Sequence, residues 1–156
     1  MPDLPDHPAI RRVQEAALRK GVTLDVVAFD ESTHTAAEAA AAVGAELGQI
    51  VKSLVFVAPH DDGGLEPIVC LVSGPDRVDV ARLAAVTGEP DIRRATAREA
   101  YELTGFSIGG IPPIGHKKEI LTYIDRSLLQ YHELWAAAGT PHAVFRITPD
   151  HLVRIV

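Results

Sequence analysis

Glycine and proline are concentrated in one short stretch, Gly105–His116, which holds four glycines and two prolines among mainly apolar residues. Glycine adopts backbone angles closed to other residues and lets a ligand approach the main chain, whereas proline fixes its own φ. The sequence therefore predicts a stiff loop with unshielded amides. Such amides can bind an anion or stabilise the developing charge of an acyl-transfer transition state. A tight turn is the alternative interpretation, but stiffness together with bare amides favours a site.

A lysine lies within an apolar segment, Ile50–Ala58, whose composition is typical of a strand covered on both faces. A period of two places Lys52 on the same face as Ile50, Leu54 and Phe56. Because desolvation of a charge is costly, this ammonium group must reach water or find a partner. Two alternatives stay open: a lysine whose head extends to solvent, and one directed into a cavity to hold a phosphate or a developing negative charge.

Length and composition predict a single domain spanning residues 1–156, with a substantial apolar core. No apolar run approaches the roughly 18 residues of a membrane span, and the first residues do not resemble a signal peptide. We therefore expect a cytoplasmic protein that does not bind membranes. The formal net charge of −6 argues against DNA binding and against a grip on long nucleic acid, but it is compatible with contact to one end of an RNA.

Metal and disulfide chemistry are not expected. Cys70 is the single cysteine and lies in an apolar run, so we interpret it as a small buried hydrophobic residue. None of the seven histidines is spaced from another, or from Cys70, in a recognisable ligand pattern. No cofactor is predicted. His34 is interpreted as a loop residue just before a helix.

Caps, apolar spacing and turn residues predict a mixed α/β fold. The expected helices cover residues 8–20, 35–43, 79–87, 96–104 and 149–153. The expected strands cover residues 22–29, 50–58, 66–73, 119–124 and 142–147, with the second and third joined as a hairpin. Asp6 is the expected cap of the first helix. A short strand is expected near Ile92, and the segment 127–138 is ambiguous between helix and strand.

Three segments occur in an order and at separations that resemble a known family: Lys52–Phe56, Gly109–Gly115 and Ala138–Thr140. The combination resembles the YbaK/prolyl-tRNA synthetase-associated domain family, and the likeness extends from about residue 35 to the last residue. The resemblance implies a single mixed α/β domain with a curved, partly barrel-like central sheet flanked by helices, and no metal. It also implies a freestanding or inserted editing domain that hydrolyses the ester of mischarged tRNA. The usual substrate is tRNA for proline carrying alanine, cysteine or another small amino acid.

The resemblance further implies which residues form the site. The hallmark lysine of the family falls on Lys52, and its Gly-x-x-x-Pro loop falls on Gly109–Pro113. We therefore predict that Lys52, Gly109 and Gly110 act in catalysis. The predicted substrate-binding residues are Ser53, Ile111, Pro113, His116, Gly139, Thr140 and His142. Relatives vary at the position of Pro112 and around 140–142, so the amino acid removed is less well defined than the reaction.

The predicted chemistry needs no nucleophilic side chain, and no Ser-His-Asp or Cys-His arrangement is evident. An aminoacyl ester is already reactive, and the resemblance implies that the terminal ribose hydroxyl of the tRNA assists its hydrolysis. The expected partner is mischarged tRNA, bound through its 3′ aminoacyl-adenosine end, with a prolyl-tRNA synthetase or an elongation factor as a possible presenter. Two other functions stay open: a non-catalytic module that binds a nucleotide, an amino acid or a protein partner in the same cleft, and a Schiff-base enzyme based on Lys52.

Overall fold

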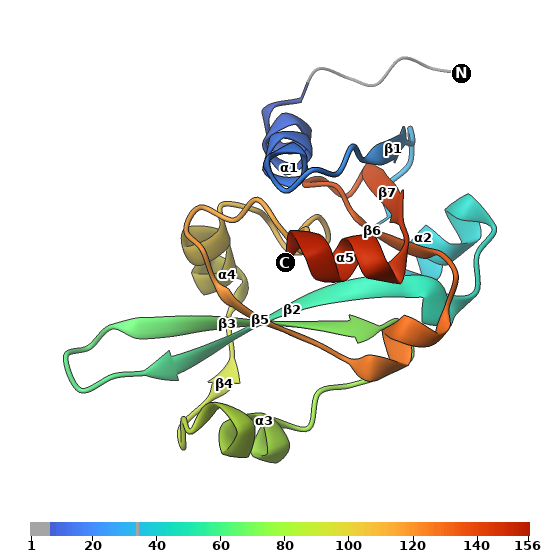
Figure 1. Cartoon of the computed structure of the whole chain (residues 1–156). Coiled ribbons are helices and arrows are strands. Elements are labelled where there is room, and N and C mark those ends of the chain that lie inside the picture. Colours follow the sequence, from blue (N-terminus) through green and yellow to red (C-terminus); the bar gives the residue numbers. More distant parts are fainter. Residues whose placement is uncertain (1–6, 34) are drawn as a thin grey trace.

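The computed structural model describes residues 7–33 and 35–156 (Figure 1). The expectations for Asp6 and His34 lie outside these residues. The first helix, α1 (Pro8–Arg19), is capped by His7, whose ring Nδ1 accepts a hydrogen bond of 3.1 Å from the Ala9 N–H. Pro8 stands at the first helical position, where its missing N–H costs no hydrogen bond.

Seven strands form one mixed sheet in the order β1-β7-β6-β2-β3-β5, with the short β4 paired to β2. Their bounds are β1 Asp25–Ala28, β2 Ile50–Pro59, β3 Leu65–Ser73, β4 Arg93–Arg94, β5 Leu121–Ile124, β6 Leu134–Ala137 and β7 Ala143–Ile147. The pairs β2–β6 and β3–β5 are parallel, and the other pairs are antiparallel. Within the described chain the sheet is not closed, because β1 and β5 lie at its two ends. The mixed α/β prediction is confirmed, and the expected barrel-like curvature stops short of a barrel.

The remaining helices are α2 (Ala36–Val43), α3 (Val80–Thr87), α4 (Ala97–Thr104) and α5 (Pro149–Ile155), with short 3-10 helices η1 (Leu47–Gln49) and η2 (Arg126–Gln130). Helices α2 and α4 each begin with a capping box. Thr35 and Thr96 each accept a hydrogen bond from the backbone N–H of the glutamate three residues later, and that carboxylate bonds back to the cap N–H. These reciprocal bonds fix where α2 and α4 begin. In the part of the chain described here, no helix is long and apolar enough to span a membrane.

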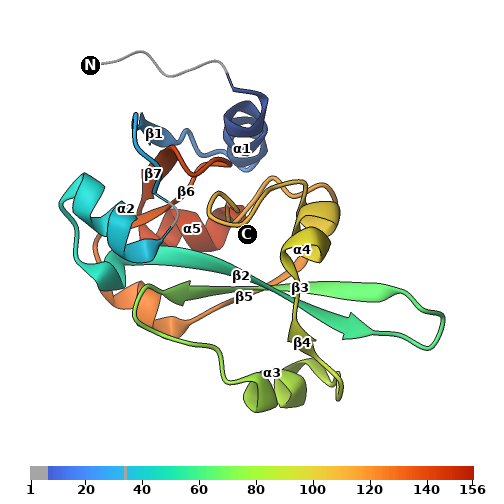
Figure 2. The ribbon, with the colours of Figure 1, turned by 180° about the vertical axis from the view of Figure 1, so that it is seen from behind.

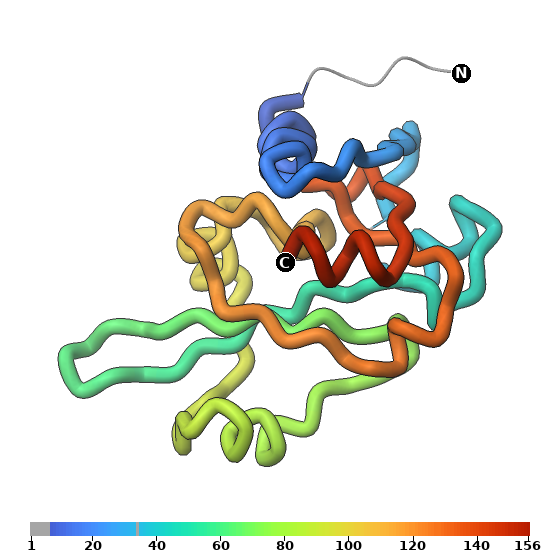
Figure 3. The backbone as a smooth tube through the Cα atoms, in the orientation of Figure 1, coloured from blue at the N-terminus to red at the C-terminus, as the bar shows by residue number. Residues whose placement is uncertain are grey.

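Helices cover the long β2–β3 hairpin on both faces (Figures 1 and 2). On one face, Val51, Val55 and Val57 join the main core with residues of α1, α4 and α5. On the other face, Phe56 and Ala58 pack with residues of α3 in a second cluster. The near-continuous apolar run of β2 is therefore explained by burial on both sides, as its composition predicted. The tip of the hairpin extends beyond the other elements (Figure 3).

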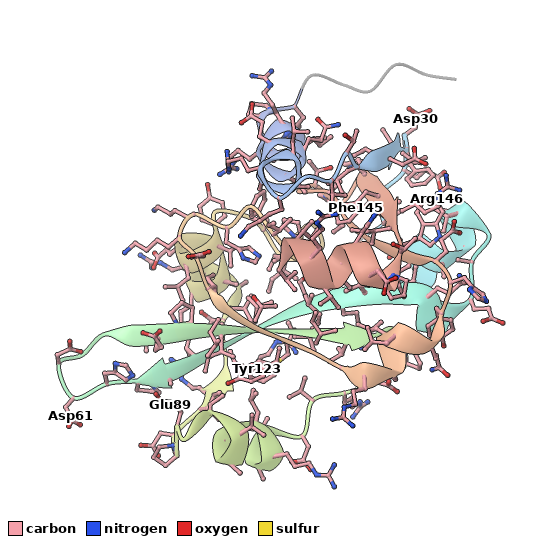
Figure 4. All side chains as sticks on the ribbon, in the orientation of Figure 1. Asp30, Asp61, Glu89, Tyr123, Phe145 and Arg146 are labelled. Atoms are coloured by element: carbon pink, nitrogen blue, oxygen red, sulfur yellow. The ribbon has the colours of Figure 1, made fainter. Side chains whose placement is uncertain are left out.

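Alternation along β7 shows how the far end of the sheet is held. Phe145 is fully buried, whereas the guanidinium of Arg146 binds the Asp25 carboxylate at 2.8 Å and the Glu133 carboxylate at 3.3 Å (Figure 4). Arg146 is thus a surface charge that is paired with two carboxylates. The ambiguous segment 127–138 contains both kinds of structure, with most of η2 followed by β6. The expected strand 22–29 is shorter, since only Asp25–Ala28 pairs with β7.

One edge of β2 is only partly covered. Strand β6 pairs with it at Ile50 and Val51, and β4 pairs with it at Phe56 and Val57. Between these two pairings, residues 52–55 face no neighbouring strand on that edge, apart from a bond of 2.9 Å from the Ala95 N–H to the Val55 carbonyl. The gap in the sheet is where the candidate site lies.

Candidate functional site

A cavity of about 250 Å³ opens at the uncovered edge of β2. Strand residues 50–55, the start of α2, β6 and the loop that follows α4 all contribute to its wall. Four of the predicted site residues line it: Lys52, Ser53, Gly109 and Ile111. The structure thus brings together the lysine and the glycine loop, which are more than fifty positions apart in the sequence.

Lys52 lines this cavity and is half-buried. Its Nζ donates a hydrogen bond of 2.6 Å to the Asp76 carbonyl. Burial lowers the pKa of Lys52, the neighbouring Asp76 acts in the opposite direction, and Arg94 and Arg77 lower this pKa further. An ammonium group has three donors, so the bond to Asp76 leaves two that can meet a ligand.

Ser53 follows Lys52 and points to the other face of the strand, because side chains alternate along β2. Its hydroxyl oxygen is buried and has no hydrogen-bond partner among the described residues. Buried hydroxyl groups are normally paired. The unpaired Ser53 hydroxyl on the cavity wall is therefore available to a ligand.

Two residues of the glycine loop, Gly109 and Ile111, line the cavity. Gly109 has a φ of +95°, a conformation that disfavours any side chain, and lines the cavity. The Gly110 N–H is already donated within the loop, to the Ser107 carbonyl at 3.0 Å. Neither the Gly109 nor the Ile111 N–H donates to another described residue. Gly109 and Ile111, in preference to Gly110, are thus the candidates for binding an oxyanion.

Gly110 and two other predicted residues form the support behind the loop. A Cβ at Gly110 would lie 2.7 Å from backbone atoms of Thr140, so the two backbones are in direct contact. Thr140 and Gly139 are buried, and neither lines the cavity. The segment 139–140 therefore fixes the position of the loop from behind.

His116 and Pro113 face a different hollow. Both line a second cavity of about 630 Å³, between the loop, α1 and the C-terminal residues. The His116 Nε2 lies 2.7 Å from the Pro112 carbonyl oxygen, and its ring meets Phe106 edge-on at 6.4 Å between centroids. Burial lowers the pKa of His116, and the bond to Pro112 partly opposes this. We therefore interpret His116 as a neutral imidazole that donates a hydrogen bond to the Pro112 carbonyl. This bond holds the loop in place from outside the first cavity.

His142 is exposed and does not line the first cavity. The residue before it is hydrogen-bonded to a residue that does line that cavity. The carbonyl of the preceding Pro141 accepts hydrogen bonds from the backbone N–H and, at 2.8 Å, from the hydroxyl of Thr33, which is a cavity residue. The His142 carbonyl accepts a bond of 2.7 Å from the Phe29 N–H.

Sequence reasoning missed several cavity residues. Arg94 lines the rim, and nothing in the sequence separates it from its neighbour Arg93. Much of the wall is formed by alanines: Ala36, Ala39, Ala95, Ala100, Ala136 and Ala137. The alanine-rich composition of residues 36–42 was the available signal, but it predicts helix more strongly than a pocket wall.

Comparisons with known proteins agree with this geometry. Residues 30–155 match the model of the family described as "Aminoacyl-tRNA editing domain". A crystal structure described as "a putative trans-editing enzyme for prolyl tRNA synthetase" is 50% identical and superposes with a TM-score of 0.85, covering 96% of this chain and 92% of that one.

Two curated relatives extend the comparison. The "Putative Cys-tRNA(Pro)/Cys-tRNA(Cys) deacylase EbsC" of Enterococcus faecalis is 27% identical over 128 residues, which are 82% of this chain and 76% of that protein. The "Proline--tRNA ligase" of Limosilactobacillus fermentum is 31% identical over 115 residues, which are 74% of this chain. The match spans only 19% of that ligase.

The chain belongs to the aminoacyl-tRNA editing domain family, because the family match covers most of its length. Members of this class cleave the ester between an amino acid and tRNA. The chain is accordingly an ester hydrolase, an aminoacyl-tRNA deacylase related to prolyl-tRNA editing.

Proposed function

We propose that this protein acts as a freestanding editing enzyme that hydrolyses tRNA for proline mischarged with a small amino acid such as alanine or cysteine. One observation carries the proposal: Lys52, Gly109 and Ile111 line one cavity, and the Gly109 and Ile111 N–H groups have no described hydrogen-bond partner. The cavity can hold the terminal ribose and a small acyl group between a cation and two oxyanion donors. The names of two similar proteins, which mention prolyl tRNA synthetase and Cys-tRNA(Pro), support this choice of tRNA.

The size of the cavity supports a small acyl group. A volume of about 250 Å³ lies just below the range of about 300–1,000 Å³ usual for ligand pockets. A synthetase discriminates one methylene by only about 1–3 kcal/mol, so it cannot exclude every smaller amino acid by binding alone. A second site that accepts the smaller acyl groups removes those errors.

The mechanism we propose uses the substrate as its own catalyst. A water molecule attacks the ester carbonyl, and the vicinal hydroxyl of the terminal ribose orients this water and relays its proton to the departing ribose oxygen. The Gly109 and Ile111 amides bind the oxyanion, where one donor is typically worth about 2.7–4 kcal/mol of barrier. Lys52 and Ser53 hold the 3′ end in register. The products are the free amino acid and uncharged tRNA.

Delivery of the tRNA requires a second component in this proposal. The chain carries a net charge of −6, which weakens its own attraction for tRNA. A prolyl-tRNA synthetase or an elongation factor would present the charged 3′ end. Co-purification from cell extract tests this: recovery of either protein supports it, and tight binding to free tRNA with neither protein present contradicts it.

The test of the function is a panel of hydrolysis assays. tRNA for proline is charged separately with alanine, cysteine, serine, threonine, 2-aminobutyrate and proline, and the rate of ester loss is measured with and without the protein. We expect rapid loss of one or more of the small non-cognate amino acids and little loss of proline. Equal rates with and without protein on every ester would overturn the proposal.

A further inference from the structure

Two adjacent arginines of β4 are used in opposite ways. The guanidinium of Arg93 binds both carboxylate oxygens of Glu99, each at 2.8 Å, and does not line the cavity. The guanidinium of Arg94 has no ion-pair partner among the described residues, and Arg94 lines the cavity rim. Its guanidinium carbon lies 5.8 Å from the centroid of the Phe56 ring, within the distance of a cation–π contact.

Arg94 is one of two arginines near Lys52, although only Arg94 shares the cavity with it. The charges of Arg94 and Arg77 are close enough to Lys52 to lower its pKa. The carboxylate of Asp76 acts in the opposite direction and raises the pKa of Lys52. One of its oxygens accepts a hydrogen bond of 3.1 Å from the Ser127 hydroxyl. Two further cations and one carboxylate thus lie near Lys52, in a chain with an overall excess of acidic residues. Such an imbalance is unfavourable unless an anion binds there.

The spacing of these cations suits a nucleic acid strand. Arg94 pairs with Phe56 across the sheet, and Phe56 lies four residues from Lys52 on the same face of β2. Four residues of strand span about 13 Å. Lys52 and Arg94, two residues with long cationic side chains, thus both line the cavity at the open edge of β2.

We propose that Arg94 is a substrate-binding residue that holds a backbone phosphate of the tRNA 3′ end, next to the terminal adenosine whose ester enters the cavity. This inference rests on the proposed function. The planar guanidinium binds a phosphate through two parallel hydrogen bonds, and the Phe56 ring holds it in place. Lys52 then binds the terminal ribose, and Arg94 binds the phosphate that precedes it. Arg77 adds positive electrostatic potential.

The experiment compares two substrates that differ in phosphate. One is alanyl-tRNA for proline, and the other is the alanyl ester of adenosine, which has no phosphate. For Arg94→Gln we expect KM for the tRNA to rise about tenfold, because the glutamine amide lacks the charge that strengthens both hydrogen bonds to the phosphate, with kcat nearly unchanged. Hydrolysis of alanyl-adenosine should stay within about twofold of the wild-type rate. Arg94→Lys should recover part of the loss.

Arg98→Gln is the matched control, because Arg98 is also on the surface but binds Glu102 at 3.0 Å and does not line the cavity. This variant should behave as wild type on both substrates. An equal loss on both substrates in Arg94→Gln would show a structural role and overturn the inference, as would an unchanged KM for the tRNA.

A binding assay separates failure of this inference from failure of the proposed function. If the wild-type protein hydrolyses neither ester, the function fails, but anisotropy of a labelled CCA trinucleotide still tests the phosphate contact. Weaker binding by Arg94→Gln, with the slope of log affinity against log salt reduced by about 0.7, supports the inference. Identical affinities and salt slopes contradict it.

Discussion

The loop at 109–116 has two faces that differ in how their polar groups are satisfied. On the cavity face, the Gly109 and Ile111 amides have no described partner and lie near the unpaired Ser53 hydroxyl. On the opposite face, the Pro112 carbonyl is bound by His116, and Gly110 lies against the Thr140 backbone. Gly109 and Ile111, whose amides lack a described partner, line the first cavity, whereas Gly110 and His116 make the contacts that hold the loop.

This contrast teaches how a bare loop can be rigid. Free amides stabilise a transition state only if they do not reorganise during the reaction. Glycine alone would make the loop pliable. Rigidity must come from the back face, where α1 also contributes: a Cβ at Gly115 would lie 3.3 Å from the Val13 Cα. The back face is thus a structural support for the chemistry of the front.

Removal of Lys52 should give the largest effect. In Lys52→Ala we expect kcat/KM for mischarged tRNA to fall about a hundredfold, because misplacement of the 3′ end by 1 Å can cost that much. Lys118→Ala is the control, since Lys118 lines the second cavity behind the loop and its loss removes the same charge. Wild-type activity in Lys52→Ala, or equal losses in both variants, would break the distinction between the two faces.

A side chain at Gly110 should damage the support. The Thr140 backbone cannot yield as a flexible side chain could, so Gly110→Ala should lower the free energy of unfolding, near the upper end of about 1–3 kcal/mol. Activity should fall with it, because the free amides shift. Denaturant unfolding and hydrolysis rates measure the two effects. An unchanged free energy of unfolding would mean that the Gly110 backbone does not pack tightly against the Thr140 backbone.

Removal of the His116 brace should cost less activity. In His116→Ala the buried Pro112 carbonyl loses its donor, which is typically worth about 1–3 kcal/mol of stability. Because His116 lies outside the first cavity, kcat should fall only a few fold. A loss as large as that of Lys52→Ala would instead place His116 in the reaction.

The smallest effect concerns the paired arginine of β4 and depends on pH. The hydrogen bonds from Arg93, followed by the Thr96 N–H, lower the pKa of Glu99 to about 2. A lowered carboxylate pKa stabilises the fold above the ordinary range near 4.5, and this contribution is lost as pH falls toward 2. Glu99→Gln should therefore show a shallower decline of unfolding free energy between pH 5 and 2. A pH profile of stability identical to that of the wild type would contradict this role of Glu99.

Local signals predicted much of the fold. Thr35 with Glu38, and Thr96 with Glu99, marked two helix starts because a capping box involves residues only three apart. The near-continuous apolar composition of 50–58 predicted β2 and both of its covered faces. The segment 127–138 resisted prediction because β6 is a strand through its pairing with β2 and β7, and those partners lie outside any local window.

The site was less predictable than the fold. Family resemblance placed Lys52, Ser53, Gly109 and Ile111 in one site, and they share one cavity. The same resemblance does not distinguish the cavity face of the loop from the opposite face, so it groups His116 and Gly110 with residues that line the cavity. Arg94 was missed because the sequence does not show that the Glu99 carboxylate binds Arg93 and leaves Arg94 without such a partner.

The most direct test of the account is an NMR titration of the ¹⁵N-labelled protein with a stable analogue of the substrate, alanine joined by an amide to 3′-amino-3′-deoxyadenosine. We predict saturable shifts of the Gly109 and Ile111 amides and of the Lys52 side chain, with Gly115 and Lys118 behind the loop unaffected. Shifts confined to Gly115, Lys118 and their neighbours in the second cavity would contradict the account.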